Sequence, residues 1–160
     1  MRWHPNATVA VVVEREGRFL MVEERSNGRV VFNQPAGHIE AGESIFDAAR
    51  RETREETGWA VELQHFMGLY TYHFAHKNRT YYRLCFTATA TEKLTDELDP
   101  DIIAAHWMTL DDIRQASDSL RSPLVIACLE DYLAGRRLPL DSIREQPEYD
   151  AGWPDPCPTN

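Results

Sequence analysis

The sequence predicts an α+β fold, an α/β/α sandwich in which helices cover a mixed β-sheet. Two observations support this class. Much of the chain consists of segments rich in β-branched and aromatic residues, and the few helical segments between them do not alternate regularly with strands. A doubly wound parallel sheet would require that alternation. The 160 residues are enough for one domain with its own hydrophobic core.

The first half of the chain begins with an expected β-hairpin. Residues 7–14 are rich in valine, and residues 19–24 resume an apolar pattern after the turn sequence EREGR. Residues 30–32 form a short third strand, which the turn-forming sequence NQPAG ends. These three strands are therefore expected to be neighbours in the sheet.

One helical segment is marked at both ends. It is expected to begin after the N-cap residue Ser44 and to continue to about Thr57, because Gly58 stops it. Two long segments rich in aromatic and β-branched residues follow, 61–72 and 80–91. The polar sequence AHKNR joins them, so they are expected to form a second hairpin.

The last part of the chain combines one strand with two helices. An acidic loop, TDELDPD, precedes a strand at 102–108, and a short helix is expected at 110–115. A longer helix is expected at 123–133, with Ser122 at its N-cap and Gly135 after its end. We therefore expect a domain over residues 1–143.

Residues 144–160 are expected to be an irregular, proline-rich tail. The three cysteines of the chain are odd in number and scattered, which indicates neither a disulfide framework nor a cysteine zinc site and suits a cytoplasmic protein. They are Cys85, Cys128 and Cys157. The net charge of −9 argues against nucleic acid or an anionic membrane as a partner. A small anionic substrate stays compatible with this charge if a cation is recruited locally.

Three glutamates gather at the end of the first helix: Glu52, Glu55 and Glu56. Like charges three or four residues apart on a helix repel each other by about 0.2–0.5 kcal/mol per pair. The negative end of the helix dipole adds about 0.3–1 kcal/mol for each carboxylate. At about 100° per residue, Glu52 and Glu56 share their direction with the apolar stripe of Phe46 and Ala49. These two side chains therefore point along the protein surface.

Two interpretations of this cluster are open. The solvent side of the helix is expected to carry a separate set of residues, Asp47, Arg50, Arg54 and Thr57. An exposed acidic face, softened by an ion pair between Arg51 and Glu55, is the first interpretation. A divalent cation among the carboxylates is the second, because hard cations take oxygen ligands. The directions of Glu52 and Glu56 favour the cation.

The spacing around the cluster resembles the signature of the Nudix hydrolases, G-x5-E-x7-R-E-U-x-E-E-x-G-U, in which U is a bulky apolar residue. All its fixed positions are present: Gly37, Glu43, Arg51, Glu52, Glu55, Glu56 and Gly58. Chance agreement has a probability of about 10⁻⁸ for each starting position. The two U positions depart mildly, since Thr53 is polar and Trp59 is larger than usual. The resemblance extends over residues 8–143.

The resemblance implies a Nudix-type α/β/α sandwich and a hydrolase that uses Mg²⁺, with Mn²⁺ as a second candidate ion. The implied metal ligands are Gly37 (through its carbonyl), Glu52, Glu55 and Glu56. The implied catalytic residues are Glu43, Arg51, Glu52 and Glu56. Arg51 would orient the neighbouring glutamates, a role that suits its planar group of donors, and Glu43 would support the same network.

The general base has two candidate locations. Glu52 is the first choice, because some family members use that position. Others use a glutamate from a distal loop, and the acidic loop here offers three carboxylates: Glu97, Asp99 and Asp101. The composition of that loop alone favours an ordinary solvated turn.

The expected substrate site lies on the second hairpin. Tyr72 and Tyr81 could stack against a ring of the substrate, and Arg83 could bind a phosphate. Other aromatic side chains of the hairpin offer similar surfaces: Tyr70, Phe74 and Tyr82. Ordinary packing on strands is the competing interpretation for these aromatic residues.

Two further stretches, VEERSNGRVVFNQPAGHIEAGE and RSPLVIACLEDYLAGRRLPLDSI, resemble a group of family phosphatases. The resemblance implies release of phosphate from nucleoside tri- and diphosphates and from hydroxymethylpyrimidine and thiamine diphosphates. A pyrophosphatase for another nucleotide, such as ADP-ribose, is an alternative. Those enzymes usually carry a proline soon after the box, whereas no proline lies between Pro35 and Pro100.

A catalytically silent nucleotide-binding module is the alternative from another class. Such modules typically lose a glutamate of the box, and this chain has all of them. The partner implied is a small diphosphate or triphosphate compound, and both a monomer and a homodimer stay open.

Overall fold

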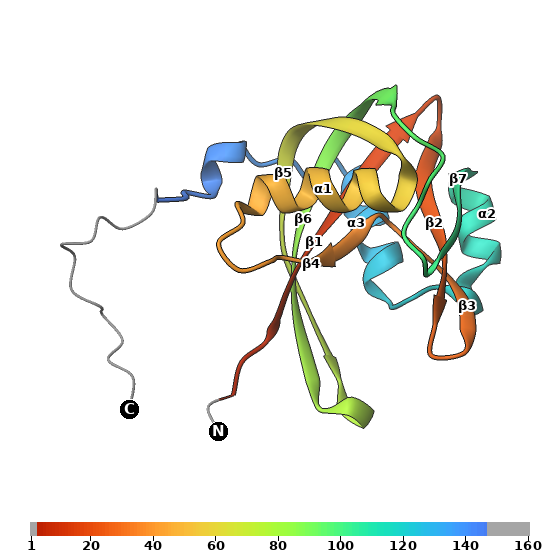
Figure 1. Ribbon diagram of the computed structural model, residues 1–160, viewed down its shortest axis with the longest axis horizontal. Coiled ribbons are helices and arrows are strands. Elements are labelled where there is room, and N and C mark those ends of the chain that lie inside the picture. Colours follow the sequence, from red (N-terminus) through yellow and green to blue (C-terminus); the bar gives the residue numbers. More distant parts are fainter. Residues whose placement is uncertain (1–2, 147–160) are drawn as a thin grey trace.

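A seven-stranded sheet forms the centre of the computed structural model, which describes residues 3–146 (Figure 1). The main path is β3-β2-β1-β6-β5, with β4 paired to β1 and β7 paired to β2. The strands are β1 (Asn6–Arg15), β2 (Arg18–Ser26), β3 (Arg29–Asn33), β4 (Ala36–His38), β5 (Trp59–Phe74), β6 (Arg79–Lys93) and β7 (Ile102–Thr109). β1 is parallel to β6 and the other pairs are antiparallel, so the predicted mixed sheet is confirmed.

Helices cover both faces of this sheet, which confirms the predicted α+β class. They are α1 (Ile45–Thr57), α2 (Leu110–Gln115) and α3 (Leu124–Leu133), with short 3₁₀ turns η1 (Ala75–Lys77), η2 (Ser117–Ser119) and η3 (Leu140–Ser142). In Figure 1, α1 lies in front of the strands and α3 behind them. Among the described residues, no helix is both long and apolar enough to cross a membrane.

The valine-rich strand β1 explains why the sheet is covered on both sides. Successive residues of a strand point to opposite faces. Val9 and Val11 pack in one cluster with Ala49 of α1, whereas Val12 packs in a second cluster with Val125 of α3. A continuous apolar run is typical of a strand that is buried on both faces.

β4 is an element that the sequence did not predict. The sequence NQPAG was expected only to end the third strand, but Ala36–His38 pairs with β1, and Gly37 lies opposite Val9. Three residues are too few to show a strand period. This short strand places the Gly37 backbone against the N-terminal half of β1, beside α1.

The C-terminal end of α1 follows the prediction. Gly58 adopts the left-handed conformation with φ 72°, and its amide donates to the Arg54 carbonyl at 2.7 Å. The ammonium group of Lys93 donates to the Thr57 carbonyl at 2.8 Å. The expected exposure of Thr57 was wrong: this residue is buried, and its hydroxyl donates to the Thr53 carbonyl and accepts from the Trp59 amide. The close attachment of β5 to the helix end removes Thr57 from solvent.

The N-terminal end of α1 is capped from a distant part of the chain. Ser44 is the N-cap residue, but its side chain does not accept a bond from the helix. Instead the Glu145 carboxylate accepts from the Ile45 amide at 2.5 Å and from the Ser44 hydroxyl at 2.7 Å. Part of the segment expected to be tail therefore contacts the domain, while residues 147–160, including Cys157, lie outside the described residues.

Glu145→Ala is expected to lower the free energy of unfolding by about 1 kcal/mol, because it removes the acceptor that caps α1. Glu145→Gln is the matched control, because its side-chain oxygen can still accept from the Ile45 amide. Thermal unfolding of both variants measures the difference, and equal melting temperatures for them would contradict the capping role.

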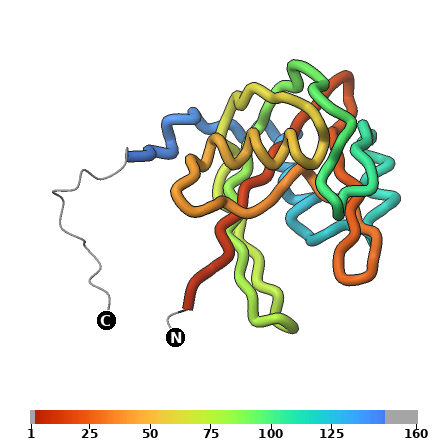
Figure 2. Tube along the Cα trace, in the orientation of Figure 1, coloured from red at the N-terminus to blue at the C-terminus, as the bar shows by residue number. Residues whose placement is uncertain are grey.

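Two long hairpins extend from the sheet. The β5–β6 hairpin turns through η1 and Asn78, which has φ 46°. Figure 2 shows that its tip projects beyond the body of the protein, beside the start of β1. The β2–β3 hairpin turns at Asn27 and Gly28, both with positive φ. Residues of both turns line the cavity described below.

Candidate active site

The acidic end of α1 is organised by Arg51. Its guanidinium group donates to both oxygens of Glu43, at 2.6 and 3.0 Å. One of its nitrogens, Nη1, also donates to Glu52 at 2.9 Å and to Glu55 at 3.0 Å. A further bond, of 3.0 Å, joins Arg51 to the His38 carbonyl at the end of β4. The arginine thus ties three carboxylates and the neighbouring strand into one network.

This network changes the protonation of its members. The bond from Arg51 lowers the pKa of the Glu43 carboxyl. In turn, the bond to Glu43 raises the pKa of Arg51 further above its ordinary value, with contributions from Glu52 and Glu55. Arg51 and Glu43 therefore form a fully ionised pair, which is what a fixed orienting group requires.

Gly37 lies directly against Glu52. A Cβ atom added at Gly37 would overlap with the carboxyl group of Glu52. The backbone here does not have the positive φ that would itself demand glycine, so the requirement comes from the close approach. The sequence-predicted ligands Gly37 and Glu52 are therefore brought into contact.

Gly37→Ala is expected to displace the Glu52 carboxylate and to lower the free energy of unfolding by about 1–3 kcal/mol, as overpacking does. We also expect a loss of most phosphate release, since the neighbouring glutamates share Arg51 with Glu52. Thermal unfolding and a phosphate assay measure the two effects. Gly42→Ala is a control outside the contact, because an added Cβ there meets nothing within 4 Å, although its φ of 76° adds backbone strain.

Glu56 is held from β4. Its Oε2 accepts the Ala36 amide at 2.8 Å, and only 7% of the residue is exposed. Burial raises the pKa of the Glu56 carboxyl well above its ordinary value, and the charges of Glu24 and Glu52 act in the same direction. Burial likewise raises the pKa of Glu52, which is 9% exposed, against the opposing effect of Arg51. A buried acidic cluster of this kind costs free energy unless a cation joins it.

The donor set fits a divalent cation. The side chains of Glu52, Glu55 and Glu56 each accept a hydrogen bond at one oxygen, from Arg51 or the Ala36 amide, and their second oxygens accept none from the described residues. Mg²⁺ binds carboxylate oxygens and keeps several of its waters. Within residues 3–146, the acidic, histidine and cysteine side chains do not form a preassembled cage of three or more. The carboxylates are gathered by Arg51 and the Ala36 amide, and each retains an oxygen for a cation.

The acidic loop before β7 also reaches this cluster. The Asp99 amide donates to the Glu55 carbonyl at 3.0 Å. Burial and the charge of Glu55 raise the pKa of Asp99, and its charge in turn raises the pKa of Glu52 and Glu56. Of the three loop carboxylates considered as bases, Asp99 is the one whose backbone bonds to α1, although it is exposed to solvent, as Glu97 and Asp101 are.

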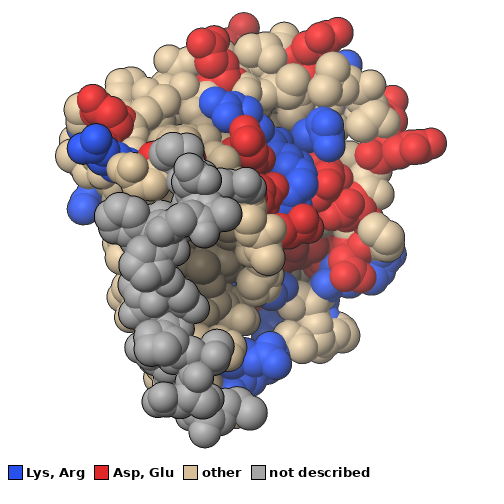
Figure 3. All heavy atoms as spheres, turned by 60° about the vertical axis from the view of Figure 1, so that its left-hand side comes forward, with Lys and Arg blue, Asp and Glu red and all other residues tan. Residues whose placement is uncertain are grey.

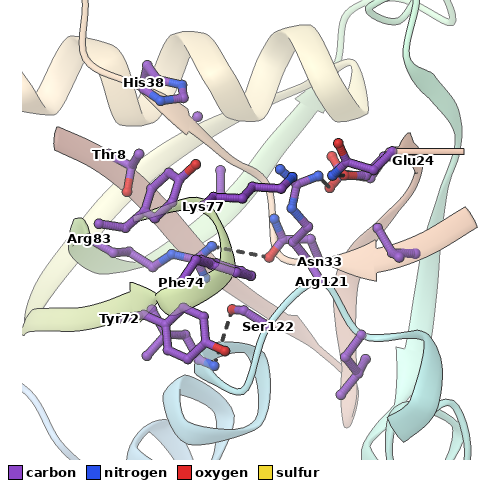
Figure 4. A pocket seen from close by; sticks show the side chains of 18 of the residues that line it. Thr8, Glu24, Asn33, His38, Tyr72, Phe74, Lys77, Arg83, Arg121 and Ser122 are labelled. Atoms are coloured by element: carbon purple, nitrogen blue, oxygen red, sulfur yellow. Dashed lines mark hydrogen bonds and ion pairs between the residues drawn. The ribbon is translucent and has the colours of Figure 1, made fainter. Parts of the chain in front are cut away.

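A cavity of about 440 Å³ adjoins the cluster (Figure 4). Ala36 and Gly37 of β4 belong to its wall, so the cavity and the acidic cluster share this strand. The three sequence-predicted substrate residues, Tyr72, Tyr81 and Arg83, all line it. A volume of this size is typical of sites for small molecules.

One wall of the cavity is aromatic and comes from the β5–β6 hairpin. Tyr72 and Phe74 make an edge contact with ring centroids 4.4 Å apart, and Phe74 and Tyr81 are 5.8 Å apart. The other aromatic candidates do not line the cavity. The Tyr70 hydroxyl instead donates to Asp131 of α3 at 2.7 Å, so this residue ties β5 to a helix.

Arg83 is a buried cation in the cavity wall. Only 8% of the residue is exposed, and its contacts with Gln34 and Asn33 are long, at 3.4 and 3.5 Å. Among the described residues no carboxylate lies within ion-pair distance of it. Figure 4 shows its guanidinium group below Lys77 and near Asn33. A buried guanidinium without a carboxylate partner favours an anionic ligand.

Sequence reasoning missed Glu24. This residue of β2 is 9% exposed, lines the cavity, and accepts from Arg121 at 3.0 Å. A signal for it was present, since adjacent residues of a strand point to opposite faces. One of the consecutive glutamates Glu23 and Glu24 therefore had to point inward.

The fold and this site define a class of enzyme. Residues 3–127 match the family model of the NUDIX domain, so the chain belongs to the Nudix hydrolases, enzymes that act on pyrophosphate bonds. The predicted family is thus confirmed. Phosphatase NudJ of Escherichia coli K12 is 42% identical over 152 residues, which is 94% of each chain, and Phosphatase NudJ of Shigella flexneri matches equally.

Solved structures agree with this assignment. A NUDIX hydrolase from Nitrosomonas europaea superposes with a TM-score of 0.86 at 41% identity and covers 89% of this chain and 98% of its own. An ADP-ribose pyrophosphatase from Streptococcus suis has a TM-score of 0.62 at 22% identity, over 81% and 92% of the two chains. The second similarity concerns the fold alone.

Proposed function

We propose that this chain is a Mg²⁺-dependent phosphatase of small diphosphate compounds. Its substrates would be nucleoside tri- and diphosphates and the diphosphates of hydroxymethylpyrimidine and thiamine, with release of phosphate. The observation that carries the proposal is the strand β4. It lies both in the wall of the cavity that holds the buried Arg83 and against the buried acidic cluster of α1. The similarity to Phosphatase NudJ over 94% of the chain supports the phosphatase activity.

The cation would be held by the carboxylates of Glu52, Glu55 and Glu56 and by the Gly37 carbonyl. Mn²⁺ is a second candidate ion, because it also prefers oxygen ligands. When bound, the cation neutralises the diphosphate and lowers the pKa of a bound water. The chain's own contribution is to keep these oxygens together, through Arg51 on one side and the Ala36 amide on the other.

Glu52 would act as the general base. One of its oxygens accepts from Arg51 at 2.9 Å, and its second oxygen, the one available to the cation, would also take the proton of the attacking water. As the water oxygen bonds to phosphorus, its proton passes to Glu52 and the phosphoanhydride P–O bond breaks in line. Asp99 is the second candidate for this role, because its charge already acts on Glu52 and Glu56.

Arg83 and the aromatic wall would hold the rest of the substrate. The buried guanidinium of Arg83 can bind a phosphate with two parallel bonds. Tyr72 and Tyr81 offer flat faces to a pyrimidine or purine ring. The unpaired, buried thiols of Cys85 and Cys128 suit a reducing, cytoplasmic setting for this activity.

A substrate panel tests the proposal. Nucleoside triphosphates, nucleoside diphosphates, thiamine diphosphate and ADP-ribose are incubated with the full chain and Mg²⁺, and orthophosphate and pyrophosphate are measured separately. Orthophosphate from the first three compounds is the expected result. Cleavage of ADP-ribose alone would support a pyrophosphatase for that nucleotide, and binding without any release would indicate a silent nucleotide-binding module.

Arg83→Gln is expected to raise the KM for diphosphate substrates about tenfold, because a hydrogen bond to a charged group contributes about 1.5–3 kcal/mol. Steady-state kinetics with thiamine diphosphate measure the change. Arg79→Gln is the matched control, since Arg79 lies on the same strand, is exposed and does not line the cavity. An equal KM for both variants would contradict the role given to Arg83.

A further inference from the structure

Glu24 is out of place in a cavity for anionic substrates. The other charged side chains that line the cavity are basic: Arg29, Lys77, Arg83 and Arg121. A carboxylate among them repels a phosphate, so its presence requires an explanation. An ordinary solvated glutamate does not fit, because only 9% of the residue is exposed.

Glu24 forms an ion pair with Arg121 through only one of its two oxygens. Its Oε1 accepts from Nη1 of Arg121 at 3.0 Å, and its Oε2 takes no hydrogen bond from the described residues. Figure 4 shows the two side chains together at the end of the cavity next to β2. The side chain of Arg121 is 39% exposed, so the arginine of this pair is accessible to solvent and to a ligand.

Glu24 also belongs to the edge of the acidic cluster. The register of β2 against β7 shifts between Glu23 and Glu24. The next amide, that of Arg25, donates to the Asp101 carbonyl at 2.8 Å, which fixes the acidic loop beside Glu24. Its charge also raises the pKa of the Glu56 carboxyl. Glu24 thus lines the cavity together with its basic side chains and with Ala36, whose amide bonds to Glu56.

A purely structural ion pair is the competing explanation. A buried pair is rarely more stable than apolar residues of the same size, because removing both charges from water is costly. Here burial, with a contribution from the charge of Asp101, raises the pKa of the Glu24 carboxyl in spite of the opposing charges of Arg121 and Arg83, and Glu24 in turn raises the pKa of Glu56. The arrangement is therefore better explained by a cation that joins the cluster than by Arg121 alone.

We propose that Glu24 is a further ligand of the divalent cation, which it approaches from the cavity side through its second oxygen, together with the second oxygen of Glu56. Arg121 is then released from Glu24 and binds a phosphate of the substrate. This inference rests on the proposed function. It assigns to a residue of β2, outside the acidic motif of α1, the link between cation binding and substrate binding.

The two members of the pair have opposite expected effects on cation binding. Glu24→Gln removes a ligand oxygen's charge, and loss of a group that supports a metal site weakens affinity about 10–100-fold. Arg121→Gln removes a competing positive charge and is expected to tighten cation binding about two- to fivefold. The same arginine variant is expected to raise the KM for a diphosphate substrate about tenfold. A general loss of structure cannot produce opposite signs.

Calorimetry with Mn²⁺ and the full chain, with and without imidodiphosphate as a diphosphate that resists hydrolysis, measures these affinities. Glu23→Gln is the matched control: it is the adjacent residue of β2, does not line the cavity and is bonded to His106 at 2.7 Å. We expect that control to bind Mn²⁺ as the wild type does. Circular dichroism verifies the fold of each variant.

Unchanged Mn²⁺ affinity in Glu24→Gln, in a wild type that binds Mn²⁺ and releases phosphate, would overturn this inference alone. A wild type that neither binds Mn²⁺ nor releases phosphate would instead overturn the proposed function. If Glu24→Gln does not fold, Arg121→Gln tests the inference by itself. Unchanged or weaker cation binding in that variant would contradict the proposal that Glu24 leaves Arg121 to bind the cation.

Discussion

Glu56→Gln is expected to abolish turnover, with a loss of about 10³-fold or more in phosphate release, because cation-assisted charge stabilisation contributes several kcal/mol. The fold should stay intact. A glutamine oxygen can still accept the Ala36 amide, which bonds to Glu56 at 2.8 Å. In the presence of a chelator the variant is even expected to melt at a higher temperature than the wild type, since it lacks one buried negative charge.

Two measurements check this prediction. Phosphate release is measured at saturating Mg²⁺, and thermal unfolding is measured in chelator and in Mg²⁺. Glu62→Gln, an exposed substitution on β5, is the control that should leave both unchanged. Undiminished phosphate release from Glu56→Gln would refute the assignment of this residue to the cation site.

Arg51→Lys has the second large expected effect. A lysine keeps the charge but cannot supply the paired bonds to Glu43 and the bonds to Glu52 and Glu55 at once. We expect kcat to fall about 10–100-fold, as for the loss of a group that orients metal ligands. The carboxylates would remain present but would no longer be held together.

Arg50→Lys is the matched control for this variant. Arg50 is the adjacent residue, pairs with Asp47 at 3.1 Å, and has a side chain that is 47% exposed. Exposed pairs of this kind contribute about 0–1 kcal/mol. Equal kcat values for Arg50→Lys and Arg51→Lys would show that the network of Arg51 does not orient the site.

The helix α1 could be predicted from the sequence because its signals are local. Ser44 and Gly58 mark its ends, and the helical period places Glu52 and Glu56 with the apolar residues, as the structure confirms. The two hydrogen bonds that Glu145 accepts from the start of the helix could not be predicted, because Glu145 lies 101 residues after Ser44 and 100 after Ile45.

The site was predictable where chemistry and spacing coincide, and not where tertiary contacts decide. Arg83 could be proposed as a phosphate ligand from its type, but its burial follows from the position of β6 beside β1. Glu24 was missed because a strand with two successive glutamates does not show which one is internal. Thr57 was misplaced because a helical period describes the helix alone and not the strand that covers its end.

The charges on the surface give little indication of the site. On the face of the molecule that Figure 3 displays, acidic and basic side chains are interleaved and do not form one large patch of a single charge. The net charge of −9 is therefore a poor guide to the local preference for anions. Under the proposed function, that preference would come from a few buried groups, of which Arg83 is the clearest.

The turns of two hairpins contribute Asn27, His76 and Lys77 to the wall of the cavity, whereas the acidic cluster lies on a helix and a strand of the sandwich. Turns tolerate substitution and insertion better than packed elements do. Substitutions at Asn27, Lys77 and their neighbours could therefore change which substrate is recognised during evolution, while the residues that would cleave the bond are kept. The same division suits laboratory evolution, where libraries confined to these two turns would diversify recognition without endangering the scaffold.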